Sequence, residues 1–151
     1  MINKLRVRAQ SESGFTLVEL LVVMLILGLL AAIAIPSFFN QRDKATDADA
    51  KSAVRTAQTA IETYATDNGG SYAAASTTNL RAIEETLNET NSGTPAVERL
   101  TVTSDADTYT VTVASDRTGG PSFSIQRTGT GTINYTCSAV GGGCPTGLDW
   151  G

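Results

Sequence analysis

The pattern of apolar and polar residues divides the chain into four stretches. Residues 1–14 are largely polar, and residues 15–39 are apolar with a single charged residue. Beyond residue 39 the apolar positions follow one helical stripe, and from residue 97 they alternate with polar ones. As an α-helix, the 25 residues of the apolar run would measure about 37 Å, enough to cross the hydrocarbon core of a bilayer. We therefore expect a membrane-spanning helix over residues 15–39 and a globular domain over residues 40–151.

The helix is predicted to continue past the apolar run, because small and apolar residues recur there at spacings of three and four. These positions are Ala50, Ala53, Val54, Ala57, Ala60, Ile61 and Tyr64. A change from an all-apolar to a one-sided pattern is typical of a helix that leaves lipid and packs on a domain. Residues 67–70 are expected to end it, because Asn and Gly accept left-handed backbone angles. Polar residues near residue 45 are expected on a solvated face or, in an assembly, between subunits: Arg42, Asp43, Lys44, Asp47, Asp49 and Lys51.

A short helix is predicted within residues 71–92, where Leu80, Ile83 and Leu87 have helical spacing and Thr78 or Asn79 caps the start. Alternation with period two then predicts four strands, separated by turn residues, near residues 100–102, 109–113, 123–125 and 133–137. The expected fold is therefore α+β. The apolar half of a long N-terminal helix protrudes, and its amphipathic half packs on a four-stranded antiparallel sheet. Trp150 is expected to pack on that sheet.

Glu19 is the charged residue within the apolar run. A charge at the centre of a membrane helix costs about 2.5–3.5 kcal/mol on insertion scales, and less near an interface. In the first turn of the helix, the helix dipole stabilises a carboxylate slightly, so the helix can tolerate Glu19 there. This does not explain why an apolar run contains a Glu, so Glu19 is a candidate functional residue. Lys4, Arg6 and Arg8 precede the run, and the positive-inside rule then keeps the N-terminus in the cytoplasm.

Gly14 followed by Phe15-Thr16-Leu17-Val18-Glu19 resembles the cleavage and methylation motif of type IV pilins and pseudopilins. The resemblance covers roughly residues 1–66, and Gly28 and Pro36 fall where this family has helix-weakening residues. It implies that prepilin peptidase removes residues 1–14 as a leader peptide, cutting between Gly14 and Phe15, and methylates the new amine of Phe15. It also implies an ATP-driven assembly platform and polymerisation with other copies.

Cleavage would create a cationic amine at Phe15, four residues or roughly 6 Å along the helix from Glu19. A neighbouring helix shifted by that distance would place its amine against this carboxylate, and a buried charge pair of this kind fixes helix register. Gly28 and Pro36 are expected to bend the membrane helix gently. The resemblance implies, as the alternative, that the segment between them loosens in a filament and lets it stretch.

The two cysteines, Cys137 and Cys144, lie on the exported side of the predicted membrane helix, where a disulfide persists. Oxidation would close a loop worth roughly 2.5 kcal/mol in the chain-entropy model. The chain has no histidine and shows no nucleophile–base pair, so we expect neither an enzyme nor a cofactor or metal site. Its net charge of −4 argues against broad nucleic-acid binding.

The resemblance therefore implies a structural subunit of a type IV pilus, with adhesion, motility or DNA uptake as the expected role. The precursor would cross the cytoplasmic membrane once, and the assembled subunit would lie at the cell surface. A close alternative is a pseudopilin of a type II secretion or competence system. An alternative of another class is a soluble secreted binding domain. Ala32-Ile33-Ala34 also fits a signal-peptidase site, and cleavage there would leave a mature chain that begins at Ile35.

Overall fold

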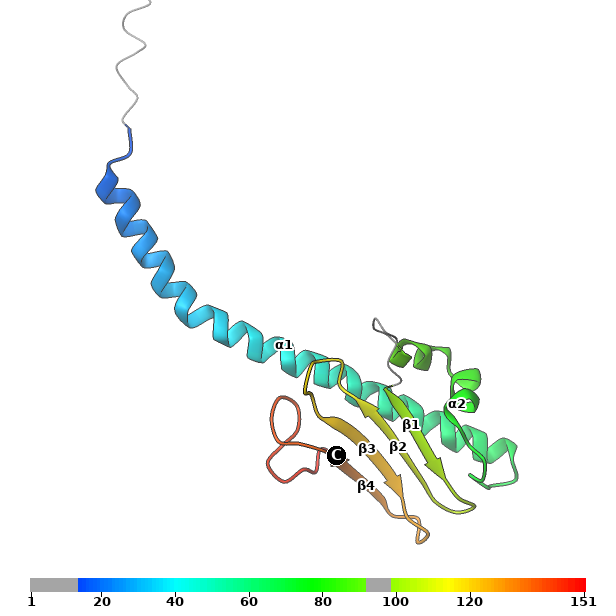
Figure 1. Ribbon diagram of the computed structural model, residues 1–151. Helices are drawn as coiled ribbons and strands as arrows, with labels where there is room; N and C mark the ends of the chain where they lie inside the picture. Colours follow the sequence, from blue (N-terminus) through cyan, green and yellow to red (C-terminus); the bar gives the residue numbers. More distant parts are fainter. Residues whose placement is uncertain (1–13, 92–98) are drawn as a thin grey trace, which may run out of the picture. The chain divides into compact units, whose positions relative to one another are not determined.

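The computed structural model describes residues 14–91 and 99–151, so most of the predicted leader, with Lys4, Arg6 and Arg8, lies outside the described residues. Figure 1 shows the helices and strands in chain order. They are α1 (Leu17–Asp67), α2 (Thr77–Ile83), the 3-10 helix η1 (Glu85–Asn91), β1 (Leu100–Ser104), β2 (Tyr109–Ala114), β3 (Ser122–Arg127) and β4 (Ile133–Cys137). The chain forms two compact units, which divide between Phe39 and Asn40.

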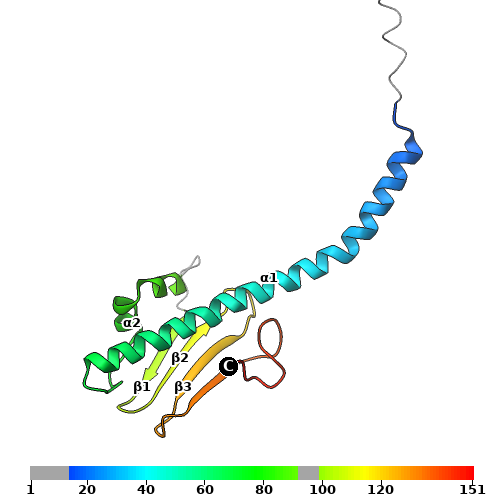
Figure 2. The ribbon, with the colours of Figure 1, turned by 180° about the vertical axis from the view of Figure 1, so that it is seen from behind.

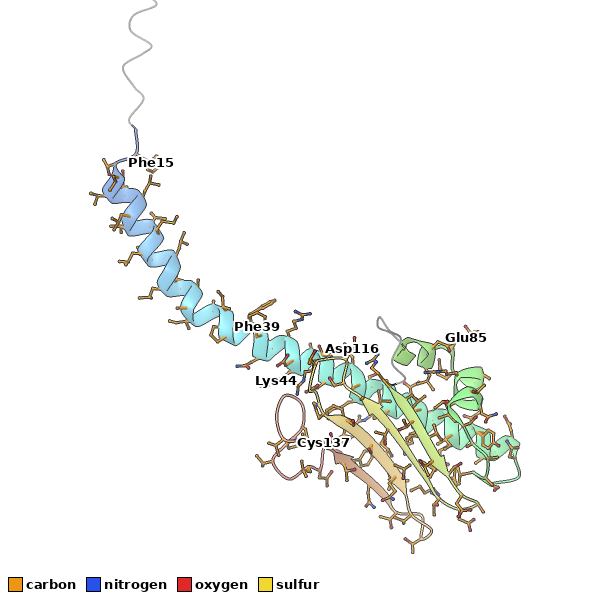
Figure 3. The ribbon with its side chains drawn as sticks, viewed as in Figure 1. Phe15, Phe39, Lys44, Glu85, Asp116 and Cys137 are labelled. Atoms are coloured by element: carbon orange, nitrogen blue, oxygen red, sulfur yellow. A yellow bond between two sulfur atoms is a disulfide. The ribbon has the colours of Figure 1, made fainter. Side chains whose placement is uncertain are left out.

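In the first unit, α1 exposes its apolar side chains all round. Figure 3 shows side chains between Phe15 and Phe39 projecting from every side of the helix. By length and composition α1 is able to cross a membrane, a test that a signal sequence near the N-terminus would also pass. The helix runs without a break through Gly28 and Pro36. Pro36 has no amide hydrogen, so it cannot donate to the carbonyl of Ala32 one turn earlier.

The second unit is an antiparallel meander against the C-terminal part of α1. The strand order is β1-β2-β3-β4. Val111 is in register with Val102 on β1 and with Ile125 on β3, while Val113 is in register with Phe123 on β3. This register places the apolar residues on one face, and Figures 1 and 2 show the sheet lying along α1. The α+β fold predicted from the sequence is confirmed.

Small residues of α1 let the helix approach the sheet closely. Ala50, Val54 and Ala57 are fully buried, and they share a core with Val111 and Phe123 of the central strands. This stripe matches the helical pattern expected from the sequence.

Trp150 packs its ring edgewise against Phe123 and Tyr135, at centroid distances of 5.7 and 5.2 Å. Its indole Nε1 donates to the carbonyl of Thr136 at 2.8 Å. The predicted packing of Trp150 on the sheet is therefore confirmed.

Two local predictions in the connection after α1 are wrong. Ser76, rather than Thr78 or Asn79, caps α2, because the helix already begins at Thr77 and the Ser76 side chain accepts from the amide of Asn79. Leu80 and Leu87 do not share one helix, since Glu84 between them is extended, with φ −133° and ψ 100°. Leu87 lies instead in η1, where it is still buried.

The expectation that Asp47 lies on a solvated or intersubunit face is also wrong. Its side chain is fully buried in the second unit. Other members of that polar set, Arg42, Lys44 and Asp49, are exposed. Asp47 differs because hydrogen-bond donors from distant segments compensate for the loss of water around its carboxylate.

Candidate functional site

The predicted cleavage site, the Gly14–Phe15 bond, lies directly before the first turn of α1. Gly14, Phe15 and Thr16 are outside the helix, which begins at Leu17. The side chain of Phe15 is 81% exposed, and a Cβ added at Gly14 would meet no atom within 4 Å. Gly14 and Phe15 are thus non-helical, and Phe15 is exposed.

Thr16 and Glu19 form a reciprocal cap at the start of α1. The amide of Glu19 donates to Thr16 Oγ1 at 3.3 Å, and the amide of Thr16 donates to Glu19 Oε2 at 3.1 Å. The Thr16 hydroxyl also donates to the same carboxylate oxygen at 3.0 Å. This is the capping box formed by Thr and Glu three residues apart, and it places the negative charge at the positive end of the helix dipole.

The capping box was missed in the sequence analysis, although Thr16-Leu17-Val18-Glu19 spells its pattern. It shows that a single chain already gives the Glu19 carboxylate hydrogen-bond partners. A pairing with a neighbour's Phe15 amine would therefore add to, or exchange with, contacts that exist before assembly. The single chain does not test that pairing.

Cys137 and Cys144 are joined by a disulfide, with their Cα atoms 6.0 Å apart. Cys137 is the last residue of β4, labelled in Figure 3, and both cysteines are buried. Gly141 and Cys144 exchange two backbone hydrogen bonds of 3.0 Å, which close the turn inside the disulfide loop, residues 137–144. The N-terminal motif and this loop lie in different units.

Comparison with known proteins shows which family motif the N-terminal segment carries. Residues 10–35 match the family model described as the prokaryotic N-terminal methylation motif. The N-terminal segment of this chain is similar to that of the type IV pilin and pseudopilin family. Members of that family are structural subunits rather than enzymes.

Pilin-family relatives with curated names come from both branches. The type II secretion system core protein G of Klebsiella michiganensis is 38% identical over 40% of this chain and 43% of that protein. The same protein of Pseudomonas aeruginosa is 39% identical over 39% of this chain and 42% of its own length. The type IV major pilin PilA of Myxococcus xanthus is 41% identical over 34% of this chain and 23% of its own. The matched segment therefore spans about two fifths of the two type II proteins and 23% of PilA. No solved structure matches this chain.

The second unit holds two acidic residues of α1 whose roles the sequence analysis missed. The first is Asp47. Its Oδ1 accepts from the Ser115 hydroxyl at 2.6 Å and from Arg117 Nε at 3.0 Å, and its Oδ2 accepts from Arg117 Nη2 at 3.2 Å. The amide of Gly143 also donates to Oδ2, at 2.8 Å.

Burial by itself would raise the pKa of the Asp47 carboxyl. The hydrogen bonds from Arg117, Ser115 and Gly143 together outweigh that effect, so the pKa of Asp47 lies below its usual value. The same contact raises the pKa of Arg117. Asp47 is therefore ionised at neutral pH, and its charge is compensated inside the fold.

The second missed residue is Glu62. Its two carboxylate oxygens each accept from a tyrosine hydroxyl, that of Tyr72 at 2.7 Å and that of Tyr109 at 2.8 Å. The two rings pack with centroids 4.9 Å apart. Burial, followed by the hydrogen bond to Glu62, raises the pKa of both tyrosines, so both hydroxyls stay protonated and donate.

No group of three or more His, Cys, Asp or Glu suited to a metal ion occurs within residues 14–91 and 99–151. Asp105 and Asp107 lie in the turn between β1 and β2, and the Asp105 carboxylate accepts from the amide of Ala106 at 2.8 Å. That contact is an ordinary turn hydrogen bond.

Proposed function

We propose that this chain is a structural subunit of a filament that assembles through the N-terminal part of α1. One observation carries the proposal. A carboxylate, Glu19, occupies the first turn of an exposed apolar helix, directly after a Gly14–Phe15 bond in the family's methylation motif. An apolar helix of this kind can pack in lipid or among its own copies, because lipid tails are as apolar as its side chains.

In this proposal residues 1–14 are a leader that prepilin peptidase removes, and the new amine of Phe15 is methylated. The precursor crosses the cytoplasmic membrane once through residues 15–39, with its N-terminus inside and residues 40–151 exported. Moving the helix from lipid into a filament gains little hydrophobic free energy, because lipid is already apolar. Packing and the pair between Glu19 and a neighbour's Phe15 amine must therefore set the register, and an assembly platform drives extraction.

Two kinds of filament fit this chain. A type IV pilus at the cell surface is favoured by the disulfide loop near the C-terminus, a feature pilins often have. A pseudopilus of a type II secretion system is favoured by similarity to core protein G of several bacteria. In a pilus, Gly28 and Pro36 would let α1 loosen and the filament stretch.

The charge pair is tested by replacing Glu19→Gln and Glu19→Ala in cells that express the chain. Glutamine at this position still forms a capping box but carries no charge. We expect both variants to insert and to be cleaved normally, and both to enter filaments at least about tenfold less than the wild type, the factor that corresponds to ~1.4 kcal/mol. A normal filament yield with Glu19→Gln would show that only the cap matters and would remove the proposed pair.

The intact mass of the chain from sheared filaments distinguishes the remaining alternatives. A mass that begins at a methylated Phe15 on external filaments supports a pilus. The same mass found only in the cell envelope indicates a pseudopilus. A chain that begins at Ile35 in the medium would show that Ala32-Ile33-Ala34 is a signal-peptidase site and that the filament proposal is wrong.

A further inference from the structure

The Asp47 carboxylate connects three segments that are far apart in the sequence. Asp47 belongs to α1, Ser115 and Arg117 to the turn between β2 and β3, and Gly143 to the disulfide loop. The side chain of Asp47 is fully buried. A buried carboxylate is stable only with its donors in place, so loss of any one donor weakens the whole contact.

The glycines of the disulfide loop allow this contact. A Cβ added at Gly142, which has φ +58°, would clash with Asp47 Oδ2 and would lie 2.8 Å from Arg117 Nη2. A Cβ at Gly143 would lie 2.8 Å from the Cβ of Asp47. The loop backbone therefore lies directly against α1, where no side chain fits between them.

The disulfide and the Asp47 contact constrain the same few residues. Gly143 is bonded in sequence to Cys144, and Cys144 is joined to Cys137 at the end of β4. The closed loop holds the Gly143 amide at the carboxylate. A contact that the oxidised loop makes better than the reduced loop stabilises the disulfide by the same free energy.

We propose that Asp47 and the Cys137–Cys144 disulfide form a redox-linked latch on α1. In the oxidised chain the loop is docked through the Gly143 amide. A dithiol reductant delivers two electrons and two protons to the S–S bond, which becomes two thiols, while the dithiol becomes a cyclic disulfide. The loop then releases Gly143, and the carboxylate keeps only Arg117 and Ser115 as partners.

The latch controls what the loop presents to the outside. Val140, at the tip of the loop, is 59% exposed while the base of the loop is buried. Release of Gly143 would free the backbone of the disulfide loop on both sides of Gly141–Gly143. Val140 would then no longer be held in one exposed position. The proposal goes beyond filament assembly, because none of its residues belongs to the N-terminal unit.

The test measures how readily the full chain, in detergent micelles, is reduced by mixtures of reduced and oxidised dithiothreitol. Alkylation followed by intact mass gives the fraction of reduced chain. We expect Asp47→Asn to be half-reduced at an about tenfold lower ratio of reduced to oxidised dithiothreitol, because a hydrogen bond to a charged group is lost. Asp49→Asn, on an exposed position of the same helix, should keep the wild-type midpoint. An unchanged midpoint in Asp47→Asn would overturn the latch.

A second pair of variants leaves the carboxylate intact. Gly143→Ala pushes the loop away from Asp47, whereas Gly147→Ala, just outside the loop, meets no atom within 4 Å. We expect Gly143→Ala to lower the midpoint ratio at least about fivefold and Gly147→Ala to leave it unchanged. Equal midpoints for the two variants would show that the loop does not depend on docking, even where Asp47→Asn fails to fold.

Discussion

At the scale of single residues, carboxylates of α1 organise the polar contacts of this chain. Glu19 caps its own helix, and Glu62 accepts hydrogen bonds from Tyr72 and Tyr109. Each carboxylate has hydrogen-bond donors beside it, which explains how the apolar helix and the packed second unit accommodate these charges. The positions differ in their partners: those of Glu19 are three residues away, whereas those of Glu62 are 10 and 47 residues away.

Glu62→Gln is expected to lower the free energy of unfolding by about 1–3 kcal/mol, because both tyrosine hydroxyls lose a charged acceptor. It should also lower the pKa of Tyr109, which Glu62 helps to raise. Chemical unfolding of the full chain in detergent measures the first effect, and absorbance titration of tyrosinate measures the second. Glu85→Gln, at the exposed position labelled in Figure 3, is the control and should change neither. A Glu62→Gln chain as stable as this control would contradict the role given to Glu62.

At the scale of elements, α1 combines a good N-terminal cap with an interior proline. The cap satisfies orphan donors at the start, whereas Pro36 leaves the carbonyl of Ala32 without a helical donor. A helix with this pattern is predicted to be weakest near residue 36. The weakness lies in the part of α1 that the proposed filament would bury.

Pro36→Ala is expected to strengthen α1, because the new amide can donate to the carbonyl of Ala32. Hydrogen exchange of the full chain in micelles should then slow at least about tenfold for amides next to residue 36, since a proline inside a helix costs ~3 kcal/mol. Gly28→Ala, where a methyl meets no atom within 4 Å, should slow exchange less and only near residue 28. Unchanged exchange in Pro36→Ala would show that the proline does not weaken this helix.

At the scale of the whole molecule, residues 40–151 are held together by one apolar core and by the contacts of Asp47. The core places the apolar stripe of α1 against the sheet. Asp47 then links α1 to the turn after β2 and to the disulfide loop. The stability of this unit should therefore depend on the ionisation of one buried group.

The pKa of Asp47 is lower in the folded chain than its ordinary value of about 3.9 in an unfolded one. A group of this kind stabilises the fold above about pH 4, and the contribution is lost as pH falls through the folded-state pKa. We expect the unfolding temperature of the wild type to fall as the pH is lowered below about 4. Asp47→Asn should unfold at a lower temperature than the wild type at neutral pH, and its unfolding temperature should fall less on acidification. Asp49→Asn should follow the wild-type curve, and parallel curves for the wild type and Asp47→Asn would contradict the assignment.

Much of the fold could be predicted from local patterns. The four strands occur where the apolar residues alternate, and the buried stripe of α1 follows the helical spacing. The capping box of Thr16 and Glu19 could also have been predicted from the sequence, because its two residues are three positions apart. The cap of α2 was misplaced by two or three residues, because Ser, Thr and Asn follow one another there and each suits the cap.

The sequence alone determined α1, the four strands, their order and the methylation motif, because helical and strand periods are properties of the local backbone and the motif is contiguous. Only the tertiary structure decided that Asp47 is buried while its neighbour Asp49 is not. The donors to Asp47 are 68, 70 and 96 residues away in the sequence, so no local sequence pattern predicts these contacts. The physical reason is that removing a carboxylate from water is costly, and only the folded chain brings together the donors that offset this cost.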